Sequence, residues 1–99
     1  MTNNYTIEKT VKEKVNISAK DLPLYKRFIG FNTTWYFRLK VIEGYLVAHK
    51  LEINTKGGHQ YLTTIPEIII DGDYDKCTED EWYGAVELLL KELDNQRRS

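Results

Sequence analysis

The sequence predicts an α+β fold: a small antiparallel β-sheet of four to five strands, a long C-terminal helix packed on one face, and a short helix near residues 22–29. Residues 33–53 alternate apolar and polar side chains with period two, which is typical of half-buried strands. Residues 82–93 instead carry apolar side chains at helical spacing. A chain of 99 residues has room for one hydrophobic core, so residues 1–99 are predicted to form a single domain.

The N-terminal third predicts one long strand followed by the short helix. Residues 5–17 fit either a strand or a helix, and their Thr, Val and Ile content favours a strand long enough to need a bend or a bulge. In the short helix, Asp21 is the candidate N-cap, Pro23 is tolerated in the first turn, and Gly30 ends the helix. The apolar side of this helix consists of Leu24, Tyr25, Phe28 and Ile29.

Residues 33–42 predict the clearest strand of the sheet, with two faces of different character. We expect the apolar face to meet the C-terminal helix; it consists of Trp35, Phe37, Leu39 and Val41. The opposite face would stay open to solvent or to a partner; it contains Tyr36, Arg38, Lys40 and Ile42.

Turn signals divide the rest of the sheet. Glu43-Gly44 predicts a tight turn, and Gly57-Gly58 predicts a second reversal, because paired glycines supply the positive φ that hairpins need. Residues 61–65 and 68–70 are both predicted to be strands. Pro66 lies between them and cannot donate to a ladder, which indicates an edge strand or a break at that point.

The final helix begins at a capping box, with Thr78 at the N-cap and Glu81 at N3. At ~1.5 Å per residue, residues 79–93 span ~22 Å, which suits a helix lying across one sheet face. Gly84 costs ~1 kcal/mol relative to Ala, and the benefit that we expect is close approach to a strand or a bulky ring. The apolar stripe consists of Trp82, Ala85, Val86, Leu89, Leu90 and Leu93.

The charge of the chain reverses along its length. Residues 1–60 carry ten Lys and Arg against five Asp and Glu, whereas residues 61–99 carry four against ten. The reversal falls at residues 71–81. We predict that this segment forms an acidic patch that docks on a protein partner, because complementary charge speeds association and selects partners. The predicted patch consists of Asp71, Asp73, Tyr74, Asp75, Glu79, Asp80 and Glu81.

The alternative function is single-stranded nucleic-acid binding by the open sheet face. Cationic side chains can follow the phosphates while aromatic rings stack on the bases. Lys and Arg are also common on the wet face of a one-sided sheet, and no RNA-binding motif accompanies them here. The residues predicted for this alternative are Tyr36, Arg38, Lys40 and Lys50.

The sequence contains no motif for catalysis, for a cofactor or for a metal ion. It lacks a phosphate-binding Gly-x4-Gly-Lys loop, a Gly-x-Ser-x-Gly elbow and a paired-His metalloprotease motif. Asp71, Asp73 and Asp75 begin a calcium-loop pattern, which Lys76 and Trp82 then break. We therefore predict a protein that is not an enzyme and has no cofactor and no metal site.

The chain shows neither a secretory signal nor a run of about 18 apolar residues, so we expect a cytoplasmic protein without a membrane partner. The first expected partner is another protein, and nucleic acid is the alternative. The edge at Pro66 and exposed Tyr36 and Ile42 also fit a homodimer. A compact chain with one acidic patch is typical of the small inhibitors and adaptors that phages and other mobile elements encode.

Overall fold

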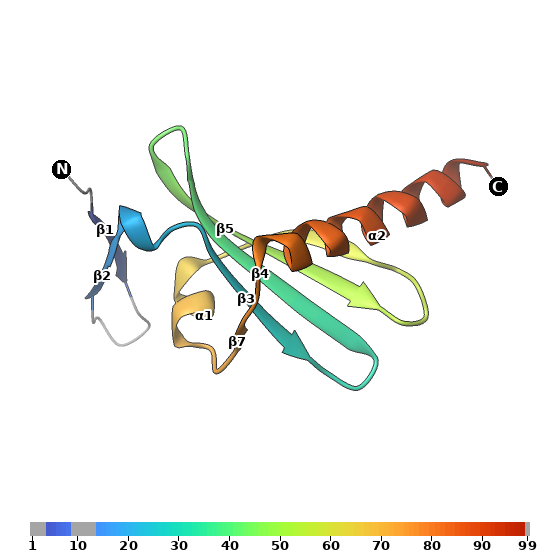
Figure 1. The fold of residues 1–99 in the computed structure, drawn as a ribbon, viewed down its shortest axis with the longest axis horizontal. Helices are drawn as coiled ribbons and strands as arrows, with labels where there is room; N and C mark the ends of the chain where they lie inside the picture. The colour runs from blue at the N-terminus through green and yellow to red at the C-terminus, as the bar shows by residue number, and fades with distance from the viewer. Residues whose placement is uncertain (1–3, 9–13, 99) are drawn as a thin grey trace.

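The computed structural model describes residues 4–8 and 14–98 and confirms the α+β fold, with a five-stranded antiparallel sheet and a long C-terminal helix (Figure 1). The strand order is β6-β5-β4-β3-β7, so β4 lies at the centre and β6 forms one edge, as Pro66 indicated. The strands are β3 (Leu24–Ile29), β4 (Thr33–Ile42), β5 (Tyr45–Asn54), β6 (Gln60–Thr64) and β7 (Asp75–Lys76).

The N-terminal segment forms a separate hairpin, and the prediction of one long strand over residues 5–17 is wrong. β1 (Asn4–Glu8) pairs antiparallel with β2 (Lys14–Ser18), which places Tyr5 opposite Ile17. Residues 9–13 of that prediction lie outside the described residues. A period-two pattern is the same whether the chain continues or reverses, which is why the sequence did not reveal the hairpin.

The short helix lies at a different place from the predicted one. Residues 24–29 form strand β3, which pairs with β4 along its six residues and with β7 on its other side. The helical element before β3 in the described chain is a single 3-10 turn, η1 (Ala19–Asp21). The short α-helix is α1 (Pro66–Asp71), where a strand was expected for residues 68–70. Pro66 occupies the first helical turn, a position at which a missing N–H costs nothing.

The long helix α2 (Glu79–Arg98) begins as predicted. The Glu81 N–H donates to Thr78 Oγ1 (3.1 Å), and the Thr78 N–H donates back to Glu81 Oε1 (3.2 Å), which confirms the capping box. A Cβ on Gly84 would meet nothing within 4 Å, so the expected close approach at this glycine is wrong. The C-terminal end of α2 extends beyond the sheet (Figure 1).

The helix packs on the opposite face of the sheet from the one predicted. Trp82, Ala85 and Leu89 of α2 form a buried cluster with Tyr25 and Leu51, against which Tyr36 packs. The face that the sequence assigned to α2 is instead covered by α1, in a second cluster that consists of Phe37, Leu39, Ala48 and Ile69. Which face α2 covers depends on the side chains that the neighbouring strands and α1 place on each face. The alternation of residues in β4 does not contain that information.

The turn at Glu43-Gly44 is confirmed. Ile42 pairs with Tyr45, and Glu43 and Gly44 have φ values of 51° and 82°, the positive values that a two-residue hairpin turn requires. Within residues 4–8 and 14–98, no helix combines the length and the apolar character needed to cross a membrane.

Candidate functional site

The acidic segment follows the surface from the end of α1 through β7 to the start of α2. Its exposed carboxylates alternate with residues that anchor the backbone to the sheet. Lys76 is the single positive side chain between residues 71 and 81. Negative charge is therefore concentrated over this short stretch of the chain. The exposed carboxylates are Asp71, Asp73, Asp75, Glu79 and Asp80.

Tyr74 was predicted as part of the docking patch, but its ring belongs to the core. It stacks on Phe37 with ring centroids 4.4 Å apart and meets Phe28 edge-on at 6.0 Å. A Cβ on Gly72 would lie 1.9 Å from Tyr74 Cε2, so the ring packs against the space that this glycine leaves. Tyr74 therefore fixes the acidic segment to the sheet, and its half-buried ring offers a partner little surface.

Glu81 also differs from the other carboxylates, because its charge is used within the protein. Besides capping Thr78, it forms an ion pair with Arg27 of β3. The neighbouring cation Lys26 donates to the carbonyl oxygen of Ile69 (2.9 Å), at the end of α1. Both cations of β3 are thus held by contacts of the fold, and neither contact involves the five exposed carboxylates.

Exposed apolar side chains lie beside the acidic segment. β7 pairs with β3 so that Asp75 lies opposite Arg27, and the Tyr74–Phe28 contact continues this side-by-side arrangement. The next residues of β3 and its turn are Ile29, which is 66% exposed, and Phe31, which is 97% exposed. The sequence pattern does not predict this apolar tip, because residues 22–29 fit a short helix that ends at Gly30.

The structure divides the predicted nucleic-acid residues between the two faces of the sheet. Phe37 pairs with Lys50 and Arg38 pairs with His49, so Lys50 lies on the α1 face whereas Tyr36, Arg38 and Lys40 lie on the α2 face. Tyr36 is half-buried against the α2 cluster, so the expectation of an exposed Tyr36 is wrong. Lys50 sits 5.2 Å from the Trp35 ring centroid and forms an ion pair with Glu52 (3.1 Å).

Arg38 lies beneath α2 in a cluster of rings. Its guanidinium carbon is 4.9 Å from the Trp82 ring centroid, and its Nη2 contacts His49 Nδ1 and donates to Tyr61 Oη, both at 3.2 Å. Burial, together with the nearby charges of Arg38 and Lys40, lowers the pKa of His49. Half-buried Arg38 therefore supports the packing of the helix.

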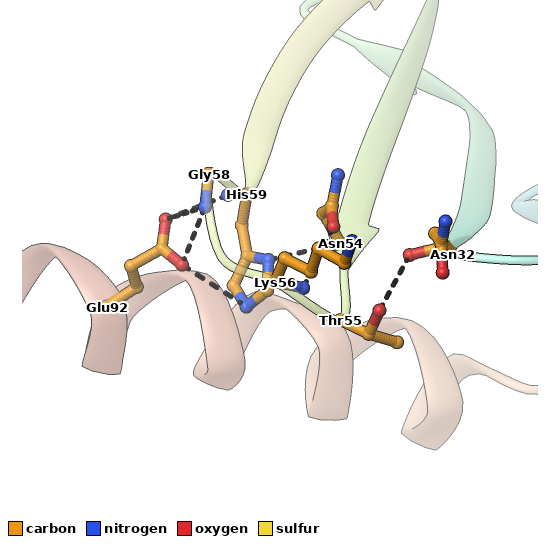
Figure 2. Close-up of polar contacts among 7 residues, drawn as sticks. All are labelled: Asn32, Asn54, Thr55, Lys56, Gly58, His59 and Glu92. Atoms are coloured by element: carbon orange, nitrogen blue, oxygen red, sulfur yellow. Dashed lines mark hydrogen bonds and ion pairs between the residues drawn. The ribbon is translucent and has the colours of Figure 1, made fainter.

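Glu92 attaches the middle of α2 to the loop between β5 and β6 (Figure 2). Its carboxylate accepts hydrogen bonds from the backbone N–H groups of Gly58 (3.1 Å) and His59 (2.8 Å), and it lies 3.5 Å from His59 Nε2. The same His59 ring accepts from the N–H of Asn54 through Nδ1 (3.0 Å). No local sequence signal predicts this contact, because the partners are more than thirty residues apart.

Within the described part of the chain, no three His, Cys, Asp or Glu side chains gather closely enough to hold a metal ion. Asp71, Asp73 and Asp75 are all exposed, and they do not form such a cluster. Comparison of the chain with protein-family models, with curated proteins and with solved structures finds no match. The proposed function therefore rests on the exposed residues of the acidic segment and the apolar side chains beside it.

Proposed function

We propose that this chain is a cytoplasmic, non-enzymatic protein-binding module that docks on a basic protein surface through the acidic segment. The observation that carries the proposal is the run of five exposed carboxylates between residues 71 and 80, beside cations that the fold already uses. Opposite charge on a partner would steer the encounter and exclude acidic competitors. A small inhibitor or adaptor acts by such docking when it covers a surface that its partner needs for its own function.

The rigidity of the segment supports the proposal. Ile69 is fully buried, Tyr74 stacks on Phe37, and the capping box fixes the start of α2. The carboxylates between these anchors are thus presented in one arrangement. A surface that is ordered before binding loses little conformational entropy in the complex, so more of the interaction energy appears as affinity.

The apolar tip, which consists of Ile29 and Phe31, offers apolar contact area that the carboxylates do not provide. Protein interfaces take most of their binding energy from a few apolar or aromatic anchors surrounded by polar contacts. Ile29 ends the strand that pairs with β7, and Phe31 lies in the turn that follows it. We therefore expect the partner to combine a basic surface with an apolar pocket that receives Phe31.

The proposal is tested by affinity capture from a host lysate treated with nuclease, followed by binding measurements on the purified partner. Neutralising the acidic segment should weaken binding by at least about tenfold, and the loss should shrink as salt rises. Phe31→Ala should also weaken binding and leave stability unchanged, because the ring is 97% exposed. The neutralised variant is Asp71→Asn, Asp73→Asn and Asp75→Asn.

A matched control removes the same number of charges from other exposed positions of the chain. It consists of Asp21→Asn, Glu43→Gln and Glu87→Gln. The control should bind as the unmodified protein does. Equal weakening by the two triple variants would show that only net charge matters and would refute docking through the acidic segment.

Single-stranded nucleic-acid binding receives little support from the arrangement of its four predicted residues, because the sheet separates Lys50 from the other three and Tyr36 is half-buried. Fluorescence anisotropy with a labelled single-stranded oligonucleotide tests this alternative directly. Tight binding that falls steeply with salt and is lost in Lys40→Glu would favour the alternative over the docking proposal.

A further inference from the structure

One side of α2 carries an apolar seam that is mostly exposed, and Val86 within it also packs against the buried cluster between α2 and the sheet. Tyr83 is 44% exposed, Leu90 57% and Leu93 47%, and Val86 is half-buried between them. These four positions follow one another at intervals of three, four and three residues, which aligns them along one line of the helix. Glu79 and Arg97, both exposed, continue the same line at its two ends.

The exposed residues of the seam lie beside the side of the helix that packs on the sheet. At ~100° per residue, it is about 90° around the axis from Trp82, Ala85 and Leu89, and about 150° from Glu81 and Glu92. Those two carboxylates contact β3 and the β5–β6 loop. In Figure 1 both elements lie below α2, and no other element of the described chain runs along its upper side.

The order of residues along the seam is self-complementary. When the helix is turned end for end about its midpoint near residue 88, Glu79 falls opposite Arg97, Tyr83 opposite Leu93, and Val86 opposite Leu90. Each apolar side chain thereby meets an apolar one, and each terminal charge meets its opposite. A parallel pairing would set Glu79 against Glu79 and Arg97 against Arg97, which like-charge repulsion disfavours.

We infer that two copies of this chain associate through antiparallel α2 helices along this seam, about a two-fold axis near residue 88. The arrangement is isologous, so each contact occurs twice, and the seam extends ~27 Å from Glu79 to Arg97. The antiparallel helices also oppose their macrodipoles favourably. The seam includes Glu79 but not Asp71, Asp73 or Asp75, so the inference is independent of the proposed docking function.

Sedimentation equilibrium of the full chain tests the association. We expect a concentration-dependent mass that approaches twice 11.7 kDa. Leu90→Glu and Leu93→Glu should each raise the dissociation constant by at least about tenfold, because each dimer would then hold two carboxylates against apolar partners. The matched control is Leu88→Glu, since Leu88 is 47% exposed, as Leu93 is, but lies about 180° from the seam. A monomer at every concentration, or equal weakening by the control, would overturn the inference.

The charges at the ends of the seam provide a test that leaves its apolar residues intact. Glu79→Arg and Arg97→Glu should each weaken the dimer, and the double variant should restore it, because the opposite charges meet again with their positions exchanged. The restored dimer should weaken in high salt, as the unmodified one does. A double variant weaker than both single ones would overturn the antiparallel register.

Disulfide trapping tests the register itself, in a background in which Cys77 is replaced by Ala. Tyr83→Cys and Leu93→Cys are prepared as separate proteins and then mixed under mild oxidation. Antiparallel pairing predicts that the mixture cross-links more rapidly than either protein by itself, because position 83 meets position 93 of the second copy. Faster cross-linking within each separate protein would indicate parallel pairing and contradict the inference.

Discussion

At the scale of single residues, two glycines close in sequence to the start of α2 have opposite roles. Gly72 leaves room for the Tyr74 ring, and a Cβ there would lie 1.9 Å from a ring carbon. Gly84 lies within α2, and a Cβ there would meet nothing within 4 Å. The first glycine is required by packing, whereas the second loses backbone entropy on folding with no contact in return.

The open space at Gly84 leads to a stability prediction. Gly84→Ala should raise the free energy of unfolding by up to ~1 kcal/mol, because Ala has the higher helix propensity and no neighbour obstructs its methyl group. Urea denaturation followed by circular dichroism measures the change. Gly72→Ala is the contrasting variant and should be destabilising; a loss of stability in Gly84→Ala of the same size would contradict the prediction.

His49 leads to a prediction about pH. Its pKa in the folded protein is lowered from the ordinary value of 6.5, mainly by burial and then by Arg38 and Lys40. The unfolded chain therefore binds a proton at this ring more readily, so the contribution of His49 to stability is complete above pH 6.5 and falls as the pH drops below it.

His49→Gln should therefore lose less stability than the unmodified protein between about pH 7 and pH 5. Gln can still accept a hydrogen bond from Arg38 but does not titrate. Urea denaturation at a series of pH values gives the comparison. Parallel stability curves for the two proteins over that interval would show that His49 does not contribute to the acid sensitivity.

At the scale of elements, the attachment of α2 to the sheet combines apolar packing at one end with a polar contact near its middle. Trp82 and Leu89 are buried against the sheet, whereas Glu92 holds the β5–β6 loop through two backbone N–H groups. Because Gly57 and Gly58 in that loop have positive φ values of 90° and 82°, the loop itself provides the turn, and Glu92 fixes its position relative to the helix.

Glu92→Ala should lower the free energy of unfolding by about 1–3 kcal/mol, since it leaves two backbone donors without their charged acceptor. Hydrogen exchange should rise at the amides of Gly58 and His59 before it rises in β4. Glu87→Ala, at an exposed position of the same helix, is the control and should change stability little. Unchanged exchange at the loop would contradict the role assigned to Glu92.

At the scale of the whole molecule, the sheet is shared by two buried clusters. Leu39 and Leu51 are both fully buried, the first on the α1 face and the second on the α2 face. Each face carries one tryptophan, Trp35 beside α1 and Trp82 on α2. Since β4 and β5 contribute to both clusters, neither cluster can be lost while the other keeps its sheet.

We therefore expect the two faces to unfold together. Trp35→Phe leaves Trp82 as the fluorescent reporter of one face, and Trp82→Phe leaves Trp35 as the reporter of the other. In each variant, the fluorescence transition in urea should coincide with the transition seen by circular dichroism. A fluorescence midpoint in either variant that differs from its circular dichroism midpoint would show that the faces unfold separately.

Features that depend on near neighbours were predictable from the sequence. The capping box of Thr78 and Glu81 and the turn at Glu43-Gly44 both arise from contacts within a few residues. The strand at residues 33–42 follows from an alternation that only extended backbone satisfies. For the candidate site, the position of the acidic carboxylates follows directly from the order of residues.

Only the tertiary structure decided which face α2 covers, that residues 24–29 form a strand, and that Tyr74 and Glu81 serve the fold. The physical reason is that each depends on partners distant in sequence. Arg27 meets Glu81 54 positions later, and Tyr25 is buried by a helix that begins at Glu79. The helix or strand propensity of single residues contributes less free energy than the burial and hydrogen bonding that such long-range partners provide.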